Sequence, residues 1–136
     1  MKIKWLFQFL LGFLLLGYSE TWGADWKYFG QTQLASYFYD DESIIHEENI
    51  VRVWLKAVYS EEGRLDEVKK LGGEYWNLTD SIALEEIYCK DRRHRVLMLI
   101  VYFMEGQAII SDIRRKERGF MIPGSILESL YKGVCK

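Results

Sequence analysis

The segment IVRVWLKAVY, residues 50–59, alternates between apolar and more polar positions. Val51, Val53 and Leu55 fall on one side of an extended chain, and Arg52 and Trp54 fall on the other. A period of two is the pattern of a β-strand with one buried face. We therefore predict a strand over this segment, with Val53 on its buried side.

Other segments show the apolar, β-branched or aromatic character of strands. A run of nine apolar residues, 96–104, is too short to span a membrane, and we predict a central strand covered on both faces. The pair Glu105–Gly106 after it indicates a tight turn. The remaining predicted strands are DWKYFG at 25–30, SYFYD at 36–40, SIALEEIYCK at 81–90 and QAIISDI at 107–113.

Two segments change to the helical period. Around 61–71, Leu65, Val68 and Leu71 recur at helical spacing, which predicts a short amphipathic helix lying on the sheet. Near 125–135, Ser125 and Glu128 form a capping box. The apolar positions that follow the cap share one helical face: Ile126, Leu127, Leu130, Tyr131 and Val134. The fold class expected is therefore α+β, an antiparallel sheet of five or six strands with a mid-chain helix and a C-terminal helix.

The first residues predict export. Lys2 and Lys4 precede an apolar stretch, and a segment of small and polar residues follows it, which is the order of a signal peptide. We expect cleavage after Gly23, with 1–23 as signal peptide and 24–136 as a single domain. A retained membrane anchor is the alternative, although the apolar stretch is shorter than the roughly 20 residues of a span. No cysteine lies near the cut, so no lipobox is present, and the exported chain is expected in the periplasm or at the cell surface.

The chain has two cysteines, Cys89 and Cys135. An even pair in an exported protein indicates a disulfide, which here would join the C-terminal helix to the sheet. A zinc site would need His46 and His94, whose spacings match no common zinc pattern. The 20 Asp and Glu against 18 Lys and Arg do not favour a nucleic-acid partner.

Several stretches together resemble the surface-adhesin protein E family of bacterial exported proteins. They are the early aromatic DWKYFG, YFYDDESI, VRVWLKAVYS, the YCK that contains Cys89, and the closing IPGSILESLYKGVC. The resemblance covers nearly all of the chain after the signal peptide. It implies a sheet of about six antiparallel strands, with a C-terminal helix disulfide-bonded to it. It also implies an adhesin that binds host extracellular-matrix and plasma proteins.

The candidate partner-binding residues are cations in two polar segments, which would bind an anionic or acidic partner. The alternative is that they are solvated turns. They are Arg92, Arg93 and Arg95, then Arg114, Arg115, Lys116 and Arg118. Trp54 has two interpretations, as an interface aromatic or as a side chain covered by the mid-chain helix.

No catalytic motif is recognisable in the sequence, so we expect no enzyme, no cofactor and no metal site. The partner expected is a protein of the host matrix or of the bacterial envelope, with a homodimer as a further option and no stable membrane span after cleavage. The alternative function is a periplasmic carrier of a small hydrophobic ligand such as haem, held in an aromatic-lined groove. His46 and His94 are the residues that could ligate haem or a metal, and the alternative for both is an ordinary surface position.

Overall fold

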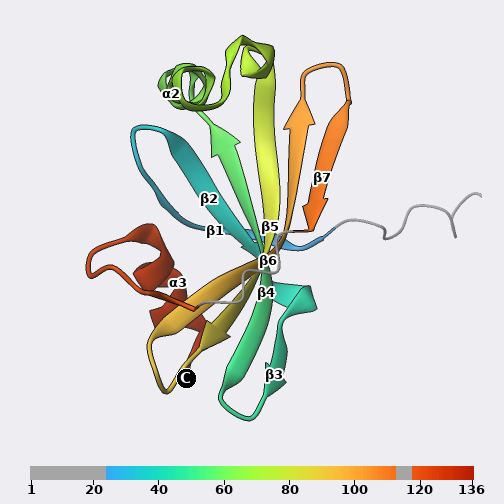
Figure 1. Ribbon diagram of the computed structural model, residues 1–136. Helices are drawn as coiled ribbons and strands as arrows, with labels where there is room; N and C mark the ends of the chain where they lie inside the picture. The colour runs from blue at the N-terminus through green and yellow to red at the C-terminus, as the bar shows by residue number, and fades with distance from the viewer. Residues whose placement is uncertain (1–23, 113–117) are drawn as a thin grey trace, which may run out of the picture.

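A computed structural model describes residues 24–112 and 118–136 (Figure 1). Within this part the chain forms one antiparallel sheet of eight strands with two α-helices and two short 3₁₀ turns. The elements are β1 (Trp26–Gln31), β2 (Ala35–Asp40), η1 (Asp41–Ser43), β3 (Ile45–Glu47), β4 (Ile50–Tyr59), α2 (Glu61–Leu71), η2 (Gly73–Tyr75), β5 (Leu78–Tyr88), β6 (Arg93–Phe103), β7 (Ala108–Asp112), β8 (Gly119–Phe120) and α3 (Ile126–Val134).

Three long strands, β4, β5 and β6, run the length of the sheet. Six strands follow the order β1-β2-β4-β5-β6-β7. The two short strands occupy the remaining edge positions, β3 beside one end of β4 and β8 beside one end of β6. In Figure 1 the strands spread apart toward both ends of the sheet. The predicted α+β class and the strands themselves are confirmed.

One face of the sheet carries the core. We call it the helix face, because α3 packs on it. Val53 and Ile87 from the sheet and Leu130 from α3 are almost completely buried there, in one cluster with Val51, Met121 and Val134. A buried aliphatic side chain of this size contributes about 1.5–3 kcal/mol. The alternation predicted for β4 is confirmed, since Val51 and Val53 are its buried residues.

The C-terminal helix is fixed at both ends. Its N-cap, Ser125, accepts a hydrogen bond from the backbone N–H of Glu128, as the capping box predicts. At the other end Cys135 is disulfide-bonded to Cys89, with 5.6 Å between their Cα atoms. The Tyr131 hydroxyl adds a hydrogen bond to the carbonyl of Cys89, 2.9 Å. The predicted disulfide between helix and sheet is confirmed.

The mid-chain helix α2 forms where the sequence predicts it, but its apolar stripe does not pack on the sheet. Leu65 and Leu71 are 53% and 52% exposed. The helix is instead held near its first turn, where Ser60 accepts from the N–H of Gly63 and the carbonyl of Leu34 lies against Gly63. In Figure 1, α2 lies beyond the end of β4 rather than across a face of the sheet. The prediction that it lies on the sheet is therefore wrong.

The other face of the sheet, which we call the open face, bears Trp54, Ile82, Leu84, Met98 and Ile100. All of these side chains are half-buried, and within β6 only Phe103 is fully buried. The apolar run 96–104 therefore does form a strand, but the prediction that both its faces are covered is wrong. Its side chains point in turn to the helix face and to the open face, except where the pairing with β5 shifts register between Val96 and Met98.

No helix in the described residues is long and apolar enough to cross a membrane. The predicted signal peptide, 1–23, lies outside the described residues.

Candidate functional site

A hollow of about 270 Å³ opens on the open face of the sheet. Trp26 of β1 and Trp54 of β4 form its aromatic wall, and Ile82 and Ile100 come from the next two strands. Ala24 and Asp40 complete the lining. The register explains the grouping, because Lys56 lies opposite Ile82, which lies opposite Ile100, and Trp54 is two residues from Lys56 on the same face.

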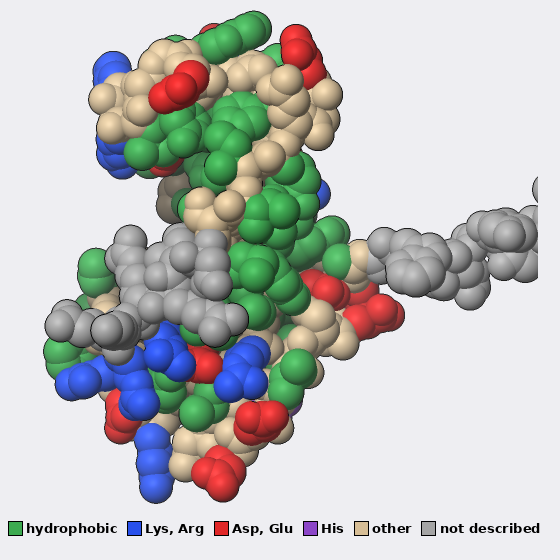
Figure 2. Space-filling model, turned by 45° about the vertical axis from the view of Figure 1, so that its right-hand side comes forward, with side chains coloured by type: hydrophobic (Ala, Val, Ile, Leu, Met, Phe, Trp, Pro, Cys, Tyr) green, Lys and Arg blue, Asp and Glu red, His purple; other side chains and the backbone are tan. Residues whose placement is uncertain are grey.

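The hollow belongs to a wider apolar surface. Figure 2 shows hydrophobic side chains along the middle of the molecule, with Lys and Arg side chains gathered below them. No residue of α2 lines the hollow. The interpretation that α2 covers Trp54 is therefore wrong, and Trp54 faces an accessible surface.

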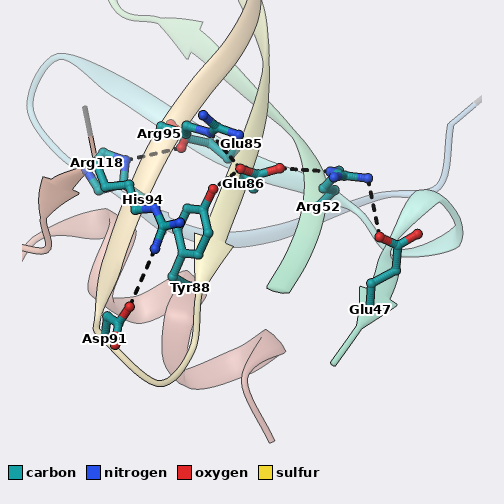
Figure 3. A network of polar contacts seen from close by, with 9 residues as sticks. All are labelled: Glu47, Arg52, Glu85, Glu86, Tyr88, Asp91, His94, Arg95 and Arg118. Atoms are coloured by element: carbon teal, nitrogen blue, oxygen red, sulfur yellow. Dashed lines mark hydrogen bonds and ion pairs between the residues drawn. The ribbon is translucent and has the colours of Figure 1, made fainter. Parts of the chain in front are cut away.

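Next to the apolar surface, three strands place charges in one row. Arg52 of β4, Glu86 of β5 and Arg95 of β6 lie opposite one another in register. Arg52 Nε is 2.9 Å from Oε2 of Glu86, and Arg95 Nε is 2.6 Å from Oε1 (Figure 3). The Tyr88 hydroxyl also donates to Oε1 of Glu86, and Glu47 lies 3.7 Å from Arg52.

The carboxylate of this row is almost completely removed from solvent, since Glu86 is 1% exposed. Burial raises the pKa of Glu86, but the hydrogen bonds from Tyr88, Arg52 and Arg95 outweigh it, so that the pKa lies below its usual value. Burial also raises the pKa of the Tyr88 phenol, and its hydrogen bond to Glu86 raises it further. Glu86 is thus held as a carboxylate that fixes two guanidinium groups at the edge of the apolar surface.

The predicted basic residues do not form one cluster. Arg95 is held by Glu86, Arg118 stacks 3.7 Å from the ring centre of Tyr88 and pairs with Asp91 at 3.6 Å, and Arg93 lies 4.2 Å over the ring of Phe120. These three arginines border the open face. Arg92 instead pairs with Glu128 of α3 at 2.8 Å, on the helix side. Arg114, Arg115 and Lys116 lie outside the described residues.

Sequence reasoning missed Glu86, Arg52 and Tyr88 as site residues. The alternation of β4 already put Arg52 on the same side as Trp54. The same period in LEEIY puts Glu86 and Tyr88 on one side of β5. What the sequence did not give was the register that sets Glu86 between two arginines.

The two histidines do not meet. His46, Val51, Ile87 and His94 follow one another across four neighbouring strands on the helix face. Neighbouring strands are about 4.8 Å apart, so the backbones of the two histidines are separated by about 14 Å. His94 Nδ1 lies 3.2 Å from Oε2 of Glu85. Among the described residues, no group of three or more His, Cys, Asp or Glu side chains is placed to hold a metal ion.

The structure is thus that of a small antiparallel sheet with a disulfide-tethered C-terminal helix on one face and an apolar surface with arginines on the other. The chain belongs to the surface-adhesin protein E family, whose model matches residues 26–136. The resemblance in the sequence is therefore confirmed over nearly the whole chain. No curated protein and no solved structure was found to match it.

Proposed function

We propose that the protein is an exported, non-catalytic binding domain of the adhesin type, whose partner is a protein of the host matrix or of the bacterial envelope. Its family supports an adhesin-like surface role. The observation that carries the proposal is the open face, where a hollow walled by Trp26 and Trp54 adjoins a row of arginines. Tryptophan, tyrosine and arginine are the residues that most often dominate binding energy at protein interfaces.

The surface defines the chemistry of the partner. The hollow is lined almost entirely by apolar atoms, so it fits an apolar side chain of the partner. Arg93 and Arg118 lie at the border and keep part of their charge toward solvent, which favours acidic residues around that apolar side chain. Arg95 is already bound to Glu86, so we assign it a positioning role.

Export and the basic residues predicted from the sequence are part of this proposal. Residues 1–23 are taken as a signal peptide and 24–136 as the adhesin domain, in the periplasm or at the cell surface. Of the predicted basic residues, Arg93 and Arg118 are assigned to partner contact and Arg95 to a positioning role, and Arg114, Arg115 and Lys116 remain candidates. Arg92, which pairs with Glu128 on the helix side, is assigned a structural role.

The test compares two tryptophan variants, Trp54→Ala in the hollow and Trp76→Ala as a matched control. Trp76 directly follows η2, is 64% exposed and does not line the hollow. Binding to immobilised extracellular-matrix proteins and to immobilised envelope proteins is measured by titration. We expect saturable binding to at least one of them, weakened about tenfold or more by Trp54→Ala and unchanged by Trp76→Ala.

Salt dependence separates the arginines from the hollow. Arg93→Ser and Arg118→Ser together are expected to weaken binding and to make it less sensitive to salt, because the lost interactions are charge pairs near solvent. Absence of saturable binding to every protein tested would overturn the proposed function. Equal effects of Trp54→Ala and Trp76→Ala would remove the hollow from the binding surface.

A further inference from the structure

We propose that the outer edge of β7, which pairs with no other strand among the described residues, is a second binding surface that takes up an extended segment of a protein partner as an added β-strand. The proposal rests on the proposed protein-binding function but uses a different surface. Strand addition to an open sheet edge gives affinity through main-chain hydrogen bonds and specificity through alternate side chains. In Figure 1, β7 is the outermost strand on its side of the sheet.

The hairpin between β6 and β7 fixes which backbone groups of β7 point outward. The N–H of Phe103 donates to the carbonyl of Gln107, and the N–H of Gly106 donates to the carbonyl of Phe103, both at 3.0 Å. Hydrogen-bonded and non-hydrogen-bonded pairs alternate along antiparallel strands. Ile109 and Ser111 therefore bond to β6. The N–H and C=O groups of Ala108 and Ile110 point away from the sheet.

The opposite edge of the sheet is protected. The pairing of β1 with β2 shifts register at Phe29, which interrupts a regular edge. At the neighbouring Gly30, the side chain of Ile126 from α3 lies so close that a Cβ would be 2.4 Å from its Cδ1. Lys27 adds a charge within the strand.

The β7 edge has none of these devices among its described side chains. Ala108, Ile109, Ile110 and Ser111 are all exposed and uncharged, and Ile110 is 67% exposed. The pairing of β7 with β6 is regular over its five residues. An exposed, regular and apolar edge strand is a template for pairing with another chain.

A pocket of about 490 Å³ adjoins this edge on the helix face. Its lining combines the rings of Tyr75 and Phe103, 5.8 Å apart, with Ala108 and Ile109 of β7. Glu74, Asn77 and Gln107 provide the polar part of the lining. Successive side chains of an added strand would point in turn to the helix face, where they meet this pocket, and to the open face, where they meet Ile110. The pocket suits a long side chain with an apolar stem and a basic end, and the Ile110 side suits an apolar residue.

A second copy of the chain fits this edge less well. Only the antiparallel register centred on Ile110 pairs the whole of β7 with the whole of its copy. In that register Ser111 of the copy lies opposite Ile109, so its short side chain leaves the pocket unfilled. We therefore assign the edge to a different polypeptide, one that alternates apolar and basic residues.

The test uses a capped peptide of alternating valine and threonine with one central lysine, added to the purified, disulfide-bonded protein. Amide hydrogen exchange is followed residue by residue by NMR. In the free protein, Ile109 and Ser111 are expected to exchange slowly, and Ala108 and Ile110 quickly. Saturating peptide should slow exchange at Ala108 and Ile110 about tenfold or more, whereas a peptide N-methylated on its pairing edge should not.

Two variants at one position complete the test. Ile110→Lys should abolish the peptide effect, because a charge on the edge opposes strand addition. Ile110→Thr is the matched control, keeps a β-branched side chain and should retain the effect. Unchanged exchange at Ala108 and Ile110 would overturn the proposal. So would retention of binding by Ile110→Lys, or protection that rises with protein concentration without peptide, which would mean pairing between copies.

The outcome is separable from that of the proposed function. Trp54→Ala should leave the peptide effect on Ala108 and Ile110 intact. Peptide protection in a protein that binds no matrix or envelope protein would sustain the edge and overturn the proposed function. Binding to a matrix or envelope protein without protection by the peptide would support the proposed function and overturn the assignment of the β7 edge.

Discussion

Glu86 is a carboxylate that lies almost completely out of water on a face of the sheet that is otherwise open. Burying an unpaired charge is strongly unfavourable, and a buried ion pair is retained only when its remaining hydrogen-bonding capacity is satisfied. Two guanidinium groups and the Tyr88 hydroxyl meet this requirement. Arg52 and Arg95 are themselves about one-third exposed, so the net stabilisation is smaller than that of a fully buried pair.

The stability of the protein is expected to depend on pH through Glu86. The pKa of Glu86 is lowered in the folded protein, whereas a glutamate in the unfolded chain titrates near about 4.3. Its stabilisation is therefore present above that pH and is lost as the pH falls through the folded-state pKa. Urea unfolding at a series of pH values from 7 to 3 should show the free energy of unfolding declining below about pH 4.3.

Replacement of this residue isolates its contribution. Glu86→Gln should lower the free energy of unfolding at pH 7 and flatten the decline in acid. Glu128, whose pKa is also lowered, first by the N–H of Gly124, supplies a second part of the same acid dependence. Glu62→Gln, at an exposed site in the first turn of α2, controls for the loss of one carboxylate. An unaltered acid dependence in Glu86→Gln would contradict the assignment.

The helix α3 depends for its stability on contacts with the rest of the fold. Nine residues are too few for a stable isolated helix in water, so its stability comes from packing and from the bond to Cys89. Leu130 and Val134 are buried against the sheet. The tether closes a loop with a sequence separation of 46 residues, which the chain-entropy model values at about 4 kcal/mol.

Removal of the disulfide is the second prediction. Cys135→Ser should lower the free energy of unfolding by about 2–5 kcal/mol, with a lower melting temperature and a free Cys89 thiol. Thermal unfolding followed by circular dichroism measures the first effect, and thiol titration of the native protein measures the second. The double variant, Cys89→Ser with Cys135→Ser, controls for dimers formed through the freed thiol. Equal melting temperatures for oxidised and reduced protein would contradict this role for the disulfide.

At the scale of elements the sequence predicted more about local structure than about packing. The six longer strands, both helices and the turn at Glu105–Gly106 could be predicted because hydrophobic period, caps and turn residues are local signals, whereas the short β3 and β8 were not predicted. The disulfide could be predicted because an exported chain with two cysteines allows one pairing. The position of α2 could not be predicted, because the stripe with Leu65 and Leu71 fits a helix packed on the sheet and equally a helix beyond the end of the sheet. The burial of β6 could not be predicted either, because a run of nine apolar residues does not indicate whether other elements cover one face of the strand or both.

Over the whole molecule, the sheet separates the aliphatic core on one face from the surface that we assign to binding on the other. The helix face holds the aliphatic core, α3 and the disulfide. The open face holds the hollow, the arginine row and half-buried apolar side chains. The sequence predicted the basic residues as a group, but it did not predict that Arg92 lies on the helix side, because the turn at 89–92 places neighbouring arginines on opposite faces.

The last prediction concerns the expected signal cleavage, which would expose a new N-terminus near Ala24, a residue that lines the hollow. Ala24 lines the hollow, and the N–H of Asp25 donates to Oδ1 of Asp40 at 3.0 Å, so the start of the domain is fixed beside Trp26. We expect protein from envelope fractions to begin at or near Ala24, as measured by N-terminal sequencing and intact mass. Recovery of the chain from Met1, embedded in membrane, would contradict export with cleavage.

Blocking the cut tests whether the free N-terminus matters for recognition. Gly23→Leu removes the small residue that signal peptidase requires next to the cut. The uncleaved chain would keep residues 1–23 attached to Ala24, which lines the hollow. Its binding to the matrix or envelope protein captured by the cleaved form should be weaker, while the β7 edge on the far side of β6 should still pair with the probe peptide. Equal binding by cleaved and uncleaved forms would show that the rim at Ala24 is not part of the contact surface.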